Sequence, residues 1–246
     1  LRDFLNTDLF PYLRLTFQTI KNIFIQLAEG IKFIHDKDCA HRDIKPENIL
    51  LKEPYDKKTE MKLKIADFGL LVNKENLLEN IKSFKINPTV GTEGYWAPEV
   101  LEKSWEQNIE NLFTQSNNQS NNQSNNKLDE TAIEMFQKTD IYSLGVIFES
   151  MIRPKLYSLN DSARNFFYDL IKKMVCINPG ERINIDEVIR ILKNDTNKTF
   201  NIGGNLSLKN KTSQIFQGGK KKSKTKKINV KINGDKNRSR SRSRRK

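Results

Sequence analysis

An ordered set of three short motifs constrains this chain more than any other feature. The residues His41 to Asn48 read H-R-D-I-K-P-E-N, Asp67 to Gly69 read D-F-G, and Ala97 to Glu99 read A-P-E. Either triplet occurs by chance in long chains and carries little information alone. An octet followed by both triplets in this order points to one kind of architecture and one kind of chemistry.

This set resembles the active half of a eukaryotic-type protein kinase of the Ser/Thr group. The resemblance covers about residues 1–194 and implies an α+β fold, namely a mainly helical C-terminal lobe with a small β-hairpin at the catalytic loop. No G-x-G-x-x-G loop precedes His41, so we expect the N-terminal lobe to be absent from this chain. Three explanations stay open: a fragment of a longer kinase, which the first residue Leu1 favours, an upper lobe supplied by another chain, or a lobe-only binding module.

The motifs contain the residue types that phosphoryl transfer requires. That reaction needs metal ions on the phosphates, a cation near the γ-phosphate and an acceptor for the proton of the substrate hydroxyl. The resemblance implies that Asp43 is the base, that Lys45 is the cation, and that Asn48 and Asp67 bind Mg²⁺, an ion that prefers oxygen ligands. ATP and Mg²⁺ are therefore the expected cofactors.

Two further features concern the substrate and the nucleotide. Lys45 stands two residues after Asp43, and Thr92 in G-T-E-G-Y-W resembles the threonine that contacts both of them in Ser/Thr kinases. Thr92 is thus expected at the catalytic centre. The resemblance also assigns Glu47 and Leu50 to cofactor binding, and the position of Glu47 contacts a basic substrate residue in some family members.

The same resemblance implies structural roles around the site. His41 and Phe68 resemble stacked residues that align the two lobes, and Asp140 resembles a buried acid that holds the catalytic loop by its backbone. Glu99 and Arg182 resemble a buried ion pair under the activation segment. The expected structural and regulatory residues are His41, Arg42, Phe68, Gly69, Glu99, Asp140 and Arg182.

Arg42 directly precedes the expected base, an arrangement that resembles kinases switched on by phosphorylation of the activation segment. The added phosphate would pair with this arginine and order the segment. The hydroxyl residues between Asp67 and Glu99 give Ser83 and Thr89 as candidate phosphosites.

Hydrophobic periodicity predicts the main elements of the lobe. Apolar residues at spacings of three and four predict helices over 17–35, 140–151, 166–174 and 185–192. Short apolar runs at 49–51 and 61–65, separated by a polar turn, predict a β-hairpin beside the catalytic loop.

The pattern fails between about residues 102 and 137, where a Q-S-N-N repeat occupies Gln115 to Asn126. This composition resembles a low-complexity insertion, and we expect a solvated loop there, with a partner-binding element as the alternative. The kinase lobe is therefore expected over 1–198, including the insertion, and a disordered basic tail over 199–246.

The net charge of +13 is concentrated in that tail. Residues 205–246 carry sixteen Lys or Arg and one acid, a net +15, which leaves the other 204 residues at about −2. Such runs bind nucleic acid without sequence preference or act as a nuclear address, and the Arg-Ser alternation is a candidate phosphorylation target. A solvated, solubilising appendage is the alternative.

The composition also limits the compartment and the function. Two cysteines are too few for a disulfide framework, and no apolar stretch is long enough to span a bilayer, so we expect an intracellular protein, cytoplasmic or nuclear, without a membrane partner. The expected function is ATP-dependent phosphorylation of Ser or Thr in protein substrates. The alternative is a catalytically weak kinase-like module whose tail binds nucleic acid or another polyanion.

Overall fold

The computed structural model describes residues 1–5, 16–52, 61–75, 77–83, 85–118, 122–156 and 159–194, all within one compact unit, Leu1–Gly204. The described part is mainly helical, with two small sheets. In chain order its elements are α1 (Arg2–Leu5), α2 (Phe17–His35), β1 (Cys39–Ala40), η2 (Pro46–Asn48), β2 (Ile49–Lys52), β3 (Lys62–Ile65), β4 (Val72–Asn73), α3 (Leu77–Lys82), α4 (Pro98–Leu101), α5 (Lys103–Asn118), α6 (Asn122–Ile152), η3 (Arg153–Lys155), α7 (Asp161–Met174) and α8 (Ile185–Asn194).

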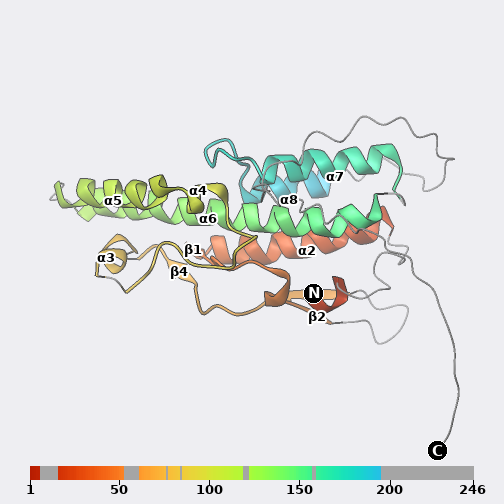
Figure 1. Ribbon diagram of the computed structural model, residues 1–246, viewed down its shortest axis with the longest axis horizontal. Coiled ribbons are helices and arrows are strands. Elements are labelled where there is room, and N and C mark those ends of the chain that lie inside the picture. The colour runs from red at the N-terminus through yellow and green to blue at the C-terminus, as the bar shows by residue number, and fades with distance from the viewer. Residues whose placement is uncertain are drawn as a thin grey trace, which may run out of the picture. The chain divides into compact units, whose positions relative to one another are not determined.

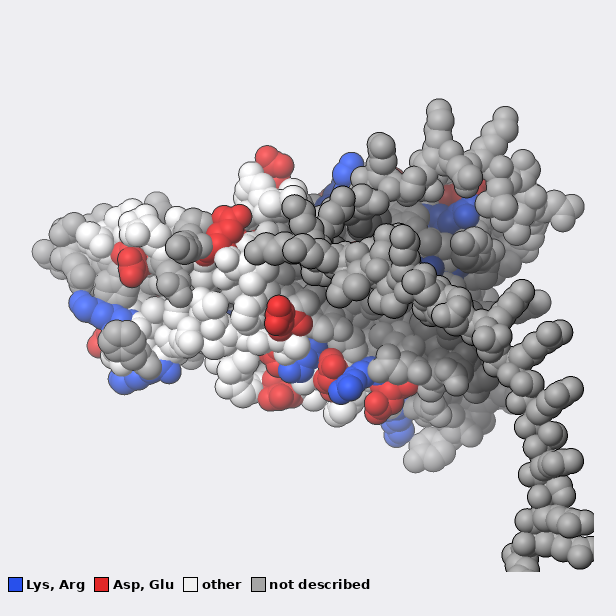
Figure 2. Space-filling model, in the orientation of Figure 1, with Lys and Arg blue, Asp and Glu red and all other residues white. Residues whose placement is uncertain are grey.

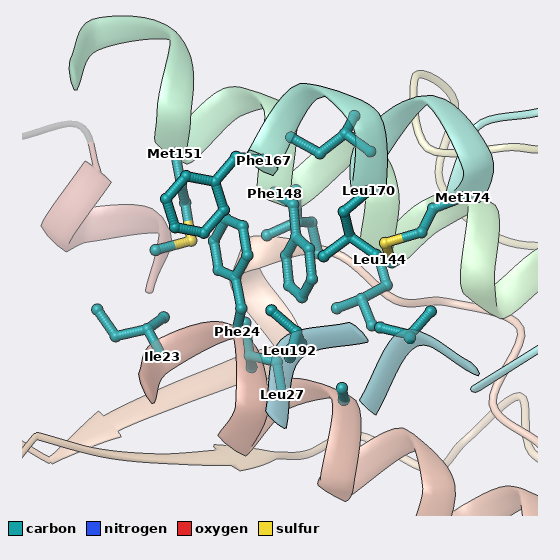
Figure 3. Packing of buried hydrophobic residues seen from close by; sticks show 14 of the residues in the cluster. Ile23, Phe24, Leu27, Leu144, Phe148, Met151, Phe167, Leu170, Met174 and Leu192 are labelled. Carbon is teal, nitrogen blue, oxygen red and sulfur yellow. The ribbon is translucent and has the colours of Figure 1, made fainter. Parts of the chain in front are cut away.

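The long helix α6 runs through the centre of the lobe, with α2 along one side and α7 along another (Figure 1). Helix α2 confirms the predicted helix, and the Thr16 side chain caps it by accepting the Thr19 N–H at 3.0 Å. Phe24 of α2 stacks on Phe148 of α6 and meets Phe167 of α7 edge-on, at centroid distances of 3.6 and 5.2 Å (Figure 3). This aromatic contact joins the three helices into one hydrophobic core.

Two short antiparallel sheets flank the loop of residues 41–48. The predicted hairpin is present as β2 and β3, with Ile49 opposite Ile65 and Lys52 opposite Lys62. Gln26 of α2 fixes this hairpin, because its side chain donates to the Met61 carbonyl and accepts from the Leu63 N–H. The second sheet pairs β1 with β4 and was not predicted, because each strand has only two residues. Together the sheets place residues 41–48 beside residues 66–71.

The prediction of a solvated loop over about 102–137 is wrong for the residues that the structure describes there. Residues 103–118 form α5, and α6 begins at Asn122, eighteen residues before the predicted start at Asp140. The two helices pack against each other, and Trp105, Ile109, Ile133 and Phe136 are buried in a second hydrophobic cluster. Burial of these side chains stabilises helices that the polar sequence around them would not support alone.

The predicted basic tail, residues 199–246, lies outside the described residues. On the face that Figure 2 shows, acidic and basic side chains of the described lobe are interspersed rather than gathered by sign. Among the described helices, none has a stretch both long and apolar enough to cross a membrane.

Candidate active site

Asp43, Lys45 and Thr92 form a closed hydrogen-bonded group. The Thr92 hydroxyl donates to Asp43 Oδ1 at 2.6 Å, and Lys45 Nζ lies 2.7 Å from both Asp43 Oδ2 and Thr92 Oγ1. Asp43 and Lys45 belong to the loop between β1 and η2, whereas Thr92 is almost fifty residues farther along the chain. Both oxygens of the Asp43 carboxylate therefore have a fixed donor, which orients the carboxylate.

Asn48 joins this group from the end of η2. Its Nδ2 donates to the Asp43 carbonyl at 2.9 Å and to Asp43 Oδ2 at 3.0 Å. The Asn48 Oδ1 atom has no hydrogen-bond partner among the described residues, so this oxygen is available to a ligand. The amide nitrogen thus holds the expected base, while no donor from the described ranges bonds to the amide oxygen.

A backbone hydrogen bond places Asp67 close to Asn48. The Ala66 N–H donates to the Asn48 carbonyl at 2.8 Å, which extends the β2–β3 ladder by one step. Asp67 follows, exposed and with φ +63°, a left-handed conformation that aspartate tolerates better than most residues. Its Oδ1 accepts the Gly69 N–H at 3.3 Å.

The oxygens of Asn48 and Asp67 fit Mg²⁺, which is usually held by one or two carboxylates together with substrate phosphates rather than by an all-protein cage. In the described ranges there is no group of three or more His, Cys, Asp or Glu side chains that could hold a metal ion. The donor set therefore suits an ion that arrives with a nucleotide.

The surroundings of Asp43 set its protonation state. Burial alone would raise the pKa of this carboxyl, but hydrogen bonds from Lys45 and Thr92, the charge of Lys45 and the amide of Asn48 outweigh burial and lower the pKa below its ordinary value. The group is consequently a carboxylate at neutral pH, the form that can accept a proton.

This lowered pKa predicts a pH-dependent contribution to stability. Because the folded state binds the Asp43 proton less tightly than the unfolded state, whose pKa is about 3.9, the contribution is complete above that value and is lost as pH falls through the folded pKa. The difference in unfolding free energy between the wild type and Asp43→Asn should be constant above about pH 5 and shrink below about pH 4. Urea unfolding over a pH range that extends below about 4 and above about 5 measures this difference. In the Thr92→Val background, which lacks one donor to Asp43, the effect of Asp43→Asn on the unfolding free energy should vary less with pH. A wild-type effect that does not vary with pH would contradict the assignment.

Asp140 of α6, which is 1% exposed, anchors the loop of residues 41–48. Its two carboxylate oxygens accept the backbone N–H groups of His41 and Arg42, each at 2.8 Å, and the ring of His35 lies 3.0 Å from Oδ2. Arg42 has φ +67°, unusual for a residue with a Cβ, and these bonds hold it there. The role of His35 was missed, because one histidine at the end of an apolar helix gives no distinctive signal.

The position of Thr92 depends on a glycine and a serine. Gly91 has φ +120°, and a Cβ there would lie 2.7 Å from the Arg42 carbonyl, so only glycine allows the segment to approach the loop this closely. On the other side, the Ser143 hydroxyl donates to the Tyr95 carbonyl at 2.7 Å and ties the segment to α6. Ser143 was also missed by the sequence analysis.

Glu99 and Arg182 form a buried bidentate ion pair, with Nη1–Oε1 and Nη2–Oε2 distances of 2.6 and 2.9 Å. Arg182 is 1% exposed and also donates to the carbonyls of Cys176 and Lys138. Every nitrogen of its guanidinium therefore has an acceptor, as a buried cation requires. The pair links the A-P-E motif to the loop between α7 and α8.

The remaining predicted residues lie around this centre. His41 is buried, and its Nε2 is 3.1 Å from the Ala66 carbonyl, while its ring and that of Phe68 have centroids 5.4 Å apart. Phe68 and Leu50 are 52% and 58% exposed. Glu47 is exposed and lies 3.6 Å from Arg2, so the structure does not bring it into the Asp43 group.

The two candidate phosphosites differ in accessibility. Ser83 is exposed at the end of α3, and its hydroxyl donates to the Glu79 carbonyl at 3.0 Å. The Thr89 hydroxyl oxygen is buried and has no hydrogen-bond partner among the residues that the structure describes. In this conformation only Ser83 presents its hydroxyl to solvent.

Comparison with known proteins gives one family. The family model for the protein kinase domain matches residues 2–191. Similar proteins include extracellular signal-regulated kinase 7 of Drosophila melanogaster, 28% identical over 193 residues (68% of this chain, 20% of that protein). CBL-interacting protein kinase 16 of Oryza sativa subsp. japonica is 30% identical over 180 residues (72% and 35%), and probable serine/threonine-protein kinase fhkE of Dictyostelium discoideum is 26% identical over 186 residues (74% and 24%). The chain spans less than half the length of these relatives.

Proposed function

This chain belongs to the protein kinase family, and on that premise we propose that it transfers the γ-phosphoryl group of ATP to Ser or Thr hydroxyls of protein substrates. The observation that carries the proposal is the hydrogen-bonded group of Asp43, Lys45, Asn48 and Thr92 beside Asp67. The Ser/Thr class is supported by Lys45 and Thr92, which contact the same carboxylate, and by the name of the Dictyostelium relative.

The residues divide the work of the reaction. The substrate hydroxyl oxygen forms a bond to the γ-phosphorus while the bond from that phosphorus to ADP breaks, and the hydroxyl proton passes to the Asp43 carboxylate. Thr92 and Lys45 hold this carboxylate in position, and the Lys45 charge lies beside the transferring group. Mg²⁺, when bound with the nucleotide, neutralises phosphate charge, and Asn48 Oδ1 and Asp67 are the oxygens that would hold it.

We propose further that this chain supplies the lower lobe of the enzyme and that residues outside it supply the upper one. The sequence has no glycine-rich loop before His41. Leu50 and Phe68 are large apolar side chains that stay more than half exposed on either side of the Asn48–Ala66 contact. Exposed apolar side chains beside a site are expected where another part of the protein or a nucleotide base covers them.

The test is phosphate transfer from ATP to a generic basic protein substrate, using the protein expressed from its complete reading frame. We expect phosphoserine or phosphothreonine that requires Mg²⁺ and is lost on chelation. Asp43→Ala in the same protein is the control. Transfer that survives Asp43→Ala, or that modifies only tyrosine, would refute the proposed mechanism or the proposed substrate class.

A second function rests on charge. We propose that the chain divides into a lobe, 1–198, and a basic tail, 199–246, and that the +15 of residues 205–246 binds nucleic acid or another polyanion in the cytoplasm or nucleus. Affinity for DNA or RNA should fall steeply with salt and disappear on deletion of 205–246. Unchanged binding after that deletion would exclude the tail as the binding segment.

A further inference from the structure

The activation segment, residues 67–99, packs against two helices. The polar sequence of these helices did not predict them. These helices are α5 and the first half of α6, residues 103–118 and 122–136, which we call the helical insert. Helix α3, within the activation segment, contacts both of them (Figure 1). The segment is therefore covered on this side by protein rather than by solvent.

The contact includes a hydrophobic cluster. Leu77 and Leu78 of α3 are 0% and 4% exposed, and they share a cluster with Trp105, Ile109 and other buried side chains of the insert. A short helix of six residues has little stability by itself, so the burial of its leucines accounts for its presence.

Each helix of the insert also makes one specific hydrogen bond to the activation segment. Asp129 Oδ1 of α6 accepts the Leu78 N–H at 2.9 Å, which satisfies a free N–H in the first turn of α3 as a helix cap would. Trp105 Nε1 of α5 donates to the Pro88 carbonyl at 3.3 Å. The two bonds reach the segment at positions ten residues apart. One therefore holds α3 and the other holds the stretch around Pro88.

Arg42 ties the beginning of the same segment to its middle. Its Nε donates to the Leu70 carbonyl at 2.8 Å and its Nη1 to the Asn87 carbonyl at 2.7 Å, while the guanidinium lies 5.4 Å from the ring centroid of Phe136 in the insert. Burial lowers the pKa of Arg42 to about 10, against the opposing effect of Asp140, so the side chain remains a cation. Two of its donors are already used by backbone carbonyls.

We infer that the helical insert holds the activation segment in the conformation that places Thr92 on Asp43, without phosphorylation, and that Asp129 and Trp105 are positioning residues for this contact. The catalytic consequence rests on the proposed function, but the structural one does not. The burial of the Thr89 hydroxyl agrees with this, because a candidate phosphosite that is buried here cannot accept a phosphate in this conformation.

Hydrogen exchange in the full 246-residue chain tests the structural part. Asp129→Ala should speed exchange of the α3 amides by roughly 5-fold, the size typical for the loss of one cap. Asp129→Asn keeps an oxygen acceptor and should restore slow exchange, and Glu130→Ala, an exposed neighbour on the same helix, should have no effect. Unchanged exchange in Asp129→Ala, or no rescue by Asp129→Asn, would overturn the inference.

Trp105 provides a second, independent arm. Trp105→Phe keeps an aromatic ring but cannot donate to Pro88, so we expect faster exchange of the amides around 86–90 while α7 and α8 remain unaffected. Exchange that rises equally in all helices would show general destabilisation instead of a local contact and would count against a positioning role.

The catalytic part is tested in the protein that transfers phosphate. Phosphatase treatment and the double variant Ser83→Ala, Thr89→Val should leave kcat and KM unchanged, while Asp129→Ala should lower kcat/KM several-fold and Asp129→Asn should restore it. Activity that depends on phosphatase or on the two hydroxyls would overturn phosphorylation independence. Absence of any transfer, with the exchange results as expected, would instead count against the proposed function.

Discussion

Asp43→Asn should lower kcat by about 10²–10⁴-fold, because the amide has nearly the shape of the carboxylate but cannot take the proton of the attacking hydroxyl. The side chain has few alternatives for rearrangement, since Thr92, Lys45 and Asn48 all contact it. The loss should therefore fall on kcat more than on KM, which is what removal of an interaction made in the transition state produces.

The measurement is steady-state phosphate transfer to a Ser- or Thr-containing substrate by the protein from the complete reading frame. Asp36→Asn is the matched control, because Asp36 is an exposed acid that pairs with Lys32 at the end of α2, away from the Asp43 group. Circular dichroism should show that both variants are folded. If Asp43→Asn keeps a tenth or more of wild-type kcat, Asp43 is not the general base.

Arg182→Ala should reduce the free energy of unfolding by about 3–5 kcal/mol, because it leaves the Glu99 carboxylate buried without its partner. The carbonyls of Cys176 and Lys138 lose donors as well. For a chain of this size the corresponding fall in Tm is about 6–20 °C. The A-P-E end of the activation segment would lose its anchor, so activity should fall together with stability.

Thermal unfolding followed by circular dichroism measures this loss. Arg190→Ala is the control, since Arg190 pairs with Glu187 at the surface, where such pairs contribute at most about 1 kcal/mol. A double variant, Arg182→Met with Glu99→Leu, removes both charges and should be less destabilised than Arg182→Ala alone. An unchanged Tm in Arg182→Ala would mean that the ion pair does not support the lobe.

The helices of the main core could be predicted because their signal is local. In α2 the buried apolar residues repeat at spacings of three and four, and they face the same core. The hairpin of β2 and β3 followed from two short apolar runs around a polar turn. The residues expected to carry chemistry could also be named, because they lie in short motifs, although their roles remain proposals.

The helical insert shows why other parts could not be predicted. Trp105, Ile109 and Leu112 do repeat at helical spacing, and this signal could have indicated α5. It was outweighed by the Asn- and Gln-rich composition around it. Whether such a weakly apolar helix forms depends on a partner surface, here α3 and the start of α6, which local sequence does not reveal.

The sequence by itself determined the family, the identity of the candidate site residues and the helices with a strong apolar period, because each of these depends on residues close together in the chain. Only the tertiary structure decided that the helical insert packs onto the activation segment, that β1 pairs with β4, and that Ser143 anchors a segment about fifty residues away. Those contacts form between distant segments, and their free energy comes from burial and from satisfied hydrogen bonds that exist only once the chain has folded.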